Sequence, residues 1–492
     1  MKKLYLVLPE EIGTISPEIY GHFSEHIGGV FYDGLWVGED SDVENIRGFR
    51  AELVRKFAAL GPAVLRWPGG CFAETYDWRD GIGVRDARPV RRSWWTPDDG
   101  RLESNAVGTH EFMDFCRLTG AKPYFAANLT AMTPRDIRDW MDYCNSPAGS
   151  TTLARLREEN GDREPFDVRY WGVGNENWGG GGNMTPEFYA DEFRRYAMLM
   201  HNVCPDAALI GCGPNGADFE WTRCFLENYR SSSRMMRGYS VHYYCGSAGD
   251  PLRFTQEEWY RQLAQARGME SLLERHWSII RGFGLESDAR LVVDEWGCWH
   301  PAGSGPSAGR NLFEQQSTMR DALVSSLTLD IFNNHCDKVM MANVAQLCNN
   351  LHCLFFADGR QFALTPTYHV FDLYRPHKDG RAIRVLHNAD PIVFDGTRSI
   401  PALSASASVR DGLLTLTVSN LSFSDPLELE LEAFGGRLAD RAEVRVLRHD
   451  DPHACNTFAY PNEVAPADAV WNLPVVELPP ASVVSIRCPL TL

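Results

Sequence analysis

The sequence has little positive charge for its length, no long hydrophobic run and no paired cysteine motif. Among 492 residues, 48 are Lys or Arg and 65 are Asp or Glu, which gives a net charge of −17. Nucleic acids and anionic membranes attract clusters of basic residues, so this balance argues against both as partners. No run approaches the roughly 18 apolar residues that a membrane span requires. The 13 cysteines show neither a CxxC pair nor zinc-type spacing, and we expect free thiols in a reducing compartment.

Signals for secretion, metal binding and cofactor binding are also missing. Only five apolar residues separate the two N-terminal lysines from Pro9, whereas a secretory signal core has roughly 7–15. We therefore expect a cytoplasmic protein. The histidines show no HExxH-like spacing, and no GxGxxG opens a helix after the first strand-like run. We expect neither a metal nor a cofactor.

Eight short apolar runs alternate with amphipathic helical patterns over residues 18–382. The runs are Ile19–Phe23, Ala63–Trp67, Lys122–Asn128, Arg169–Val173, Ala207–Gly211, Gly238–His242, Arg290–Asp294 and Val339–Ala345. The helical patterns include Phe49–Leu60, Gly108–Thr119, Pro134–Cys144, Pro186–Asn202 and Gln315–Asn333. Strands that alternate with helices indicate a parallel sheet. Eight units without a phosphate loop favour an α/β protein with a closed (β/α)₈ barrel over an open doubly wound sheet.

The pattern changes after residue 382 to strict alternation of apolar and polar residues. Ala402–Val409 and Leu413–Leu421 flank Asp411-Gly412, which is a strong hairpin signal. We predict an all-β, jelly-roll-like sandwich over residues 383–492. The alternating N-terminal run Lys3–Leu8 is expected to complete it, so that residues 1–17 belong to the same domain.

Polar and aromatic residues follow the predicted barrel strands directly. In a (β/α)₈ barrel the functional site lies where the strands end, so these residues are expected to meet at one mouth. They are Glu25-His26, Arg66–Phe72, Asn128, Gly174–Trp178, His242–Tyr244, Asp294–Gly297 and Gln346. Random surface loops would be richer in Lys, Ser and Asp.

Two glutamates in this set, Glu176 and Glu295, lie beside tryptophans at the ends of the fourth and seventh strands. Side chains at those strands can face each other across the mouth. Glycoside cleavage needs one carboxylic acid to protonate the leaving oxygen and one carboxylate opposite it. The alternative for a single glutamate at a strand end is an ion pair or a loop cap. The pair instead predicts a glycoside hydrolase, with a retaining enzyme requiring a gap of roughly 5–5.5 Å and an inverting one ~6.5–9.5 Å.

At this point the chain resembles glycoside hydrolase family 51, the α-L-arabinofuranosidases. Gly174-Asn175-Glu176 alone is typical of the whole clan of retaining barrel glycosidases. The joint set of motifs is more specific and runs over nearly the whole length. It consists of Tyr20–His26, Trp36–Ser41, Arg66–Phe72, Trp78–Gly81, Trp171–Trp178 and Val293–Gly297.

The resemblance implies a role for each glutamate. Glu176 resembles the acid/base, and Glu295 resembles the nucleophile that forms a furanosyl-enzyme ester. Asn175 is similar to the asparagine that hydrogen-bonds the sugar 2-OH. Glu25, Tyr244 and Gln346 look like further sugar-binding residues. Arg66 and Tyr244 are candidate hydrogen-bond donors to Glu295.

Several other site residues have an alternative explanation. His242 would face the same side of its strand as Tyr244 and could orient a glutamate, or it could be a hydrogen-bonded core histidine. Cys71 stands where some family members have Asn; it is expected to contact the sugar or only to line the pocket floor, since a thiol is a weak hydrogen-bond partner. Trp94, Trp178 and Trp299 could form the pocket wall or fill the core.

The resemblance implies an exo-acting enzyme that releases terminal non-reducing arabinofuranosyl residues from oligosaccharides, and a homo-oligomer such as a hexamer. Three other substrate specificities are alternatives with the same mechanism. They are those of a β-D-galactofuranosidase, a β-xylosidase and an enzyme that cleaves within a β-glucan chain. A carbohydrate-binding barrel without catalysis is the non-enzyme alternative. It would be expected to lack one of the two carboxylates, and both are present.

Overall fold

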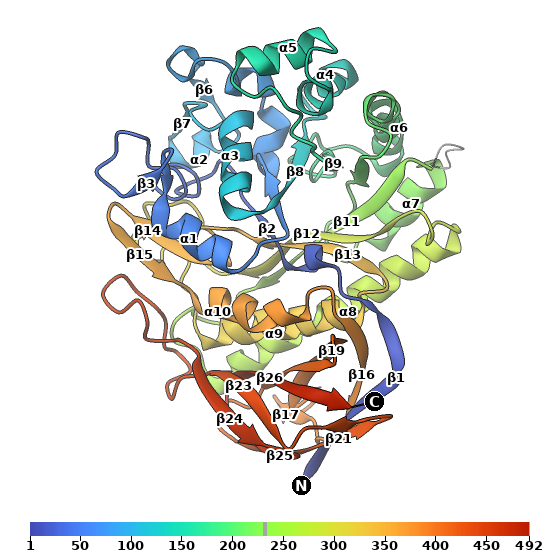
Figure 1. Cartoon of the computed structure of the whole chain (residues 1–492), viewed down its shortest axis with the longest axis vertical. Coiled ribbons are helices and arrows are strands. Elements are labelled where there is room, and N and C mark those ends of the chain that lie inside the picture. Colours follow the sequence, from blue (N-terminus) through green and yellow to red (C-terminus); the bar gives the residue numbers. More distant parts are fainter. Residues whose placement is uncertain (230–233, 492) are drawn as a thin grey trace. The chain divides into compact units, whose positions relative to one another are not determined.

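A computed structural model describes residues 1–229 and 234–491 of the chain. Eight strands form a closed parallel barrel in the order β10-β11-β12-β13-β2-β5-β8-β9, so neighbours in the barrel are consecutive in the chain (Figure 1). Their bounds are β2 Gly21–Phe23, β5 Val64–Trp67, β8 Lys122–Ala127, β9 Tyr170–Val173, β10 Ala208–Gly211, β11 Met236–Gly246, β12 Arg290–Trp299 and β13 Val339–Ala345. The predicted (β/α)₈ barrel is confirmed. Each predicted run overlaps one strand, although Ile19 and Tyr20 of the first run lie in a 3₁₀ helix, Pro17–Tyr20, before β2.

Helices occur where the amphipathic patterns predicted them. They are α1 Ala51–Ala59, α3 Thr109–Thr119, α4 Pro134–Asn145, α6 Pro186–Val203 and α9 Met319–Asn334. The first turns of α4 and α6 carry Pro, and the side chains of Thr133 and Thr185 accept a backbone N–H at each start. A hydroxyl at that position satisfies a donor that the helix leaves unpaired, which sets the helix start.

The C-terminal region forms a ten-stranded sheet, with the path β24-β23-β26-β20-β19-β16-β1-β21-β25 and β22 paired to β26. Its strands are β1 Lys2–Thr14, β16 Arg381–His387, β19 Leu403–Arg410, β20 Leu413–Asn420, β21 Leu427–Phe434, β22 Arg437–Leu438, β23 Arg441–Leu447, β24 Ala467–Asn472, β25 Val475–Leu478 and β26 Ser482–Thr491. β19 and β20 form the predicted hairpin, with Asp411 at φ 52° and Gly412 at φ 75°. Positive φ at both central residues is the geometry that matches strand twist.

One apolar core joins both ends of this sheet. It includes Leu4 of β1, Leu416 of β20, Leu429 of β21 and Val444 of β23, all buried. Apolar side chains from distant strands of the path therefore face one another, as in a sandwich. The predicted β-sandwich is confirmed.

The other face of the sheet is covered by α9 and α10 (Pro366–Tyr374), which contact β19, β23 and β26 (Figure 1). This explains why β20 is buried along nearly its whole length.

The chain divides into two compact units. One consists of Gly21–Tyr243 and Leu272–Glu295; the other consists of Met1–Tyr20, Tyr244–Ser271 and Trp296–Leu492. The domain boundary at residue 382 stays a prediction. Within residues 1–229 and 234–491, we find no helix with the length and apolar character needed to cross a bilayer.

Candidate active site

Glu176 lies in the turn that follows β9. Gly174 and Glu176 both have positive φ, at 90° and 44°. A left-handed backbone is uncommon for a residue with a side chain and needs support from its surroundings. The Glu176 side chain is 21 % exposed. This carboxylate is therefore within reach of solvent or a leaving group.

Glu295 lies on β12, and its side chain is only 8 % exposed. The guanidinium of Arg66, on β5, donates through Nη1 to Glu295 Oε1 at 2.9 Å. Arg66 also donates through Nη2 to Asn175 Oδ1 at 2.6 Å. The prediction that Arg66 would donate to Glu295 is confirmed. A buried charged donor favours the ionised form of this carboxylate.

His242, on β11, lies between the two carboxylates. Its Nδ1 is 2.9 Å from Glu176 Oε1 and 3.6 Å from Glu295 Oε2. One ligand-type atom of each of the three residues lies within 4.8 Å of the others. Burial lowers the pKa of His242, but the charge of Glu295 and the hydrogen bond to Glu176 outweigh it and raise the pKa overall. The histidine is thus held by both glutamates rather than by the core alone.

The side chain of Asn175 is buried, and its amide oxygen Oδ1 faces Arg66. Because Arg66 donates to Oδ1, the remaining group is the Nδ2 donor, which has no hydrogen-bond partner among the described residues. An unpaired buried donor is costly unless a ligand satisfies it. The backbone N–H of Asn175 donates to Glu74 Oε1 at 2.8 Å.

Glu25, which follows β2, accepts the backbone N–H groups of Gly70 at 3.0 Å and Phe72 at 2.9 Å through Oε1. Burial and the nearby charge of Glu295 raise the pKa of Glu25 to about 7. These contacts attach the Gly-Gly turn after β5 to the end of β2.

Cys71 lies next to the candidate acid/base, with Sγ 3.8 Å from Glu176 Oε2. Burial, with the charges of Glu25 and Glu176, raises the pKa of the thiol well above its usual value. A Cβ built on Gly180 would lie 2.7 Å from Cys71 Sγ and 3.2 Å from the Trp94 ring. Trp94 and the turn after Glu176 therefore meet beside Cys71. All 13 cysteines are free.

The remaining predicted residues lie at the ends of β9, β11, β12 and β13. Tyr244 is on β11, two residues after His242, and its ring meets the edge of Trp299 at 5.1 Å. Trp299, at the end of β12, is 39 % exposed and also contacts Phe313 at 5.1 Å. Gln346 follows β13 and is buried. Trp178 is half-buried in the turn after Glu176.

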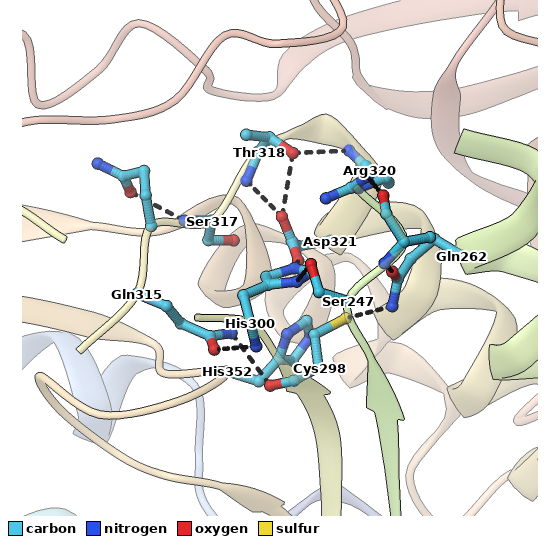
Figure 2. A network of polar contacts seen from close by, with 12 residues as sticks. Ser247, Gln262, Cys298, His300, Gln315, Ser317, Thr318, Arg320, Asp321 and His352 are labelled. Carbon is cyan, nitrogen blue, oxygen red and sulfur yellow. Dashed lines mark hydrogen bonds and ion pairs between the residues drawn. The ribbon is translucent and has the colours of Figure 1, made fainter. Parts of the chain in front are cut away.

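A second polar cluster, Cys298, Asp321 and His352, also offers metal-ligand atoms within 4.8 Å of one another. Figure 2 shows Asp321 between Thr318 and His300. Asp321 Oδ2 accepts the backbone N–H of Thr318 at 2.8 Å and its hydroxyl at 3.0 Å, and Oδ1 faces His300 Nε2 at 2.9 Å. The carboxylate is thus already engaged in capping α9 and fixing the residue after Trp299. The absence of a metal from the enzyme stays a prediction.

Glu74 was not predicted as a site residue from the sequence, although it lies just beyond the Arg66–Phe72 motif. It is fully buried in a short 3₁₀ helix, Cys71–Thr75, and accepts hydrogen bonds from residues after β8 and β9. Those partners are 55–103 positions away in sequence, so local pattern carries no signal for them.

Two family models match the chain. Residues 56–249 match the family model "Alpha-L-arabinofuranosidase 1 domain", and residues 294–482 match "Alpha-L-arabinofuranosidase C-terminal domain". The chain is 36 % identical over 462 residues to the "Intracellular exo-alpha-L-arabinofuranosidase" of Bacteroides ovatus. The alignment covers 92 % of this chain and 88 % of that protein.

Solved structures give the same answer. The GH51 arabinofuranosidase from Xanthomonas axonopodis pv. citri is similar with a TM-score of 0.93 and 35 % identity, covering 99 % of this chain and 100 % of that one. The α-L-arabinofuranosidase of Thermotoga maritima, solved as an arabinose complex, has a TM-score of 0.84 and 29 % identity, with 99 % of both chains covered. The motif resemblance is confirmed, and the chain belongs to glycoside hydrolase family 51, the α-L-arabinofuranosidases.

Proposed function

We propose that the chain is a retaining, exo-acting α-L-arabinofuranosidase that releases terminal non-reducing arabinofuranosyl residues from arabinan and arabinoxylan fragments. The observation that carries this proposal is the Glu176–His242–Glu295 group, in which one atom from each residue lies within 4.8 Å of the others. One carboxylate oxygen of Glu176 and one of Glu295 are therefore at most 4.8 Å apart, which supports the roughly 5–5.5 Å gap of retaining enzymes over the ~6.5–9.5 Å that an inverting enzyme needs for its water.

The surroundings of the two glutamates support different roles for them. Glu295 is the more buried and accepts a hydrogen bond from Arg66, which suits an ionised nucleophile. Glu176 is more exposed and lies in a turn, which suits proton exchange with the leaving group and with water. Glu176 protonates the glycosidic oxygen as Glu295 attacks the anomeric carbon and forms an ester. Water, deprotonated by Glu176, then displaces Glu295, so two inversions give overall retention.

The unpaired Nδ2 of Asn175 is proposed to donate to the sugar 2-OH. A hydrogen bond there is worth most if it strengthens as positive charge develops on the sugar ring. Five further residues are proposed to bind the sugar, and three tryptophans to line the pocket wall. The binding residues are Glu25, Cys71, His242, Tyr244 and Gln346, and the wall residues are Trp94, Trp178 and Trp299.

We also propose a location, a domain division and an assembly. The Bacteroides relative is named intracellular, which supports a cytoplasmic enzyme acting on imported oligosaccharides. We propose a catalytic domain of residues 18–382 and a sandwich domain of residues 383–492 together with residues 1–17. Strand β1 pairs with β16 and β21, which supports this grouping. The homo-oligomer, including a hexamer, stays a prediction.

The test is hydrolysis of 4-nitrophenyl α-L-arabinofuranoside. We expect release of 4-nitrophenol, with the sugar first released in the α configuration when the reaction is followed by NMR. No turnover of this substrate, with the aryl β-D-galactofuranoside, the β-D-xyloside or a β-glucan cleaved instead, would contradict the arabinofuranosidase and favour that alternative.

The Glu295→Ala variant tests the nucleophile. Activity should fall below detection, and azide should restore turnover of an activated aryl substrate by entering the space left by the carboxylate. The product should be the arabinofuranosyl azide of inverted configuration. Unchanged hydrolysis by this variant would refute the assignment of Glu295.

A further inference from the structure

Glu74 is a fully buried carboxylate that accepts hydrogen bonds from backbone and side-chain amides next to the candidate catalytic residues. Its Oε2 accepts the backbone N–H groups of Leu129 at 2.7 Å and Thr130 at 2.8 Å, just after β8. Its Oε1 accepts the backbone N–H of Asn175 at 2.8 Å and the side-chain Nδ2 of Asn177 at 3.1 Å. One carboxylate therefore joins the ends of two neighbouring barrel strands.

Asn175 and Asn177 are the two neighbours of Glu176 in the chain. Asn177 Nδ2 also donates to Gly181 O at 2.7 Å, and the N–H of Gly181 returns to Glu176 O at 3.0 Å. The turn that carries Glu176 is thus fastened on both sides to Glu74. Since Glu176 itself has φ 44°, a conformation that costs energy for a non-glycine residue, these contacts supply the constraint that keeps it there.

We propose that Glu74 is a positioning residue for the acid/base Glu176 and holds its carboxyl group in line with the leaving-group oxygen. The inference rests on the proposed glycosidase function and adds a residue to it. Proton donation depends on hydrogen-bond reach between the acid and the leaving oxygen, so a small displacement of the turn reduces it sharply.

The chemistry of the four donors makes Glu74→Gln a sharp probe. Each carboxylate oxygen faces two N–H donors. Three of the four are backbone groups, which only donate, and the fourth, Asn177 Nδ2, is kept in its orientation by its second hydrogen bond to Gly181 O. Glutamine has the same shape, but in either orientation its NH₂ group meets two N–H groups at about 3 Å. The substitution keeps the volume and removes the tether on one side.

The readout is the dependence of kcat/KM on the leaving group. Dinitrophenolate departs without a proton, whereas methoxide needs the general acid. We expect kcat/KM of Glu74→Gln to fall roughly 10–100-fold for the methyl α-L-arabinofuranoside and less than about threefold for the 2,4-dinitrophenyl glycoside. With the dinitrophenyl substrate, kcat and KM should fall together, because hydrolysis of the ester also needs Glu176 as base.

Glu111→Gln is the matched control. Glu111 is also buried and accepts a backbone N–H, that of Gly108 at 2.8 Å, together with Arg88 at 3.0 Å, but it caps α3. Its variant should lose stability without changing the ratio of the two kcat/KM values. If Glu74→Gln does not fold, Asn177→Ala removes a single donor and should change the ratio in the same direction by a smaller factor.

Equal losses on both substrates, or a wild-type ratio in the folded Glu74→Gln protein, would overturn the positioning role. If the wild-type enzyme cleaves neither arabinofuranoside, the proposed function fails, and the tether is then measured by hydrogen exchange. The amides of Leu129, Thr130 and Asn175 should exchange faster in Glu74→Gln than in wild type, and unchanged exchange would also overturn the inference.

Discussion

Gly70, in the loop after β5, lies against the candidate nucleophile. A Cβ built there would lie 2.9 Å from Glu295 Oε1 and 3.4 Å from Asn175 Nδ2. The first distance is shorter than van der Waals contact allows, and Glu295 cannot easily retreat, because Arg66 holds it at 2.9 Å. The absence of a side chain at Gly70 therefore leaves the space that the nucleophile occupies.

Gly70→Ala should lower kcat/KM for the aryl arabinofuranoside by roughly tenfold or more, since displacement of a reacting group by a fraction of an ångström is costly. Gly282→Ala is the matched control: no atom lies within 4 Å of its Cβ, and it ends helix α8 (Gln256–Gly282). That variant should keep wild-type activity and gain slightly in thermal stability. Wild-type kcat/KM in Gly70→Ala would show that the nucleophile tolerates displacement.

Individual residues also differ in whether their place in the site can be predicted from the sequence. Glu176 and Glu295 were predictable because each directly follows an apolar strand, and barrel geometry brings strand ends together. Glu74 was not, because its importance comes from donors after β8 and β9 that only the folded chain brings to it. The unpaired Nδ2 of Asn175 likewise depends on the direction of the Arg66 hydrogen bond, which no motif encodes.

Helix α9 shows how an element is attached to the sheet by polar rather than apolar contacts. Asp330, fully buried on α9, accepts hydroxyl hydrogen bonds from Ser404 and Ser406 of β19 at 2.7 Å each, and from Thr417 of β20 at 3.0 Å. The sequence predicted these strands and the helix itself, but not that the helix covers them, because the residues on that face of the strands are small and polar. A Ser or Thr in a strand is equally compatible with solvent.

Asp330 should make stability depend on pH. Burial raises its pKa from 3.8 to about 6 in spite of the hydroxyl donors. A raised pKa means that the folded protein binds the proton more tightly, so this contribution is complete below pH 4 and is lost as pH rises through 6. The loss is about 3 kcal/mol, since one pKa unit corresponds to about 1.4 kcal/mol.

The Asp330→Asn variant should unfold in urea with a free energy that changes less between pH 4 and 6 than that of wild type. Asparagine is tolerated because the partner hydroxyls can accept as well as donate, unlike the N–H partners of Glu74. Ser404→Ala keeps the carboxyl group and removes a donor that lowers its pKa, so its pH dependence should be at least as strong as that of wild type. Parallel curves for wild type and Asp330→Asn would contradict the shift.

At the scale of the whole molecule, the two ends of the chain meet in one sheet. β1 pairs antiparallel with β16 on one side and parallel with β21 on the other, so the N-terminal strand is internal to the sheet. The barrel was predictable as eight repeated units, and the alternation of Lys3–Leu8 suggested its place in the sandwich. The strand order could not be predicted, because it depends on pairing between β1 and β16, whose partners Thr14 and Arg381, for example, lie far apart in the sequence.

Deletion of residues 2–14 should therefore damage the protein far more than the loss of an ordinary terminus, which is usually tolerated. It removes Leu4 and Leu6, both 0 % exposed, and leaves β16 and β21 with unpaired backbone groups in the middle of the sheet. Each buried leucine alone contributes roughly 2–5 kcal/mol, which together approaches the 5–15 kcal/mol of a typical domain. We expect aggregation on expression, because exposed strand edges pair between molecules.

A peptide of residues 1–17, supplied during refolding, should restore soluble, active enzyme by filling the vacant position. The same peptide with Leu4 and Leu6 changed to Asp should not. A soluble deletion variant with the wild-type melting temperature would show that β1 is dispensable to the sheet.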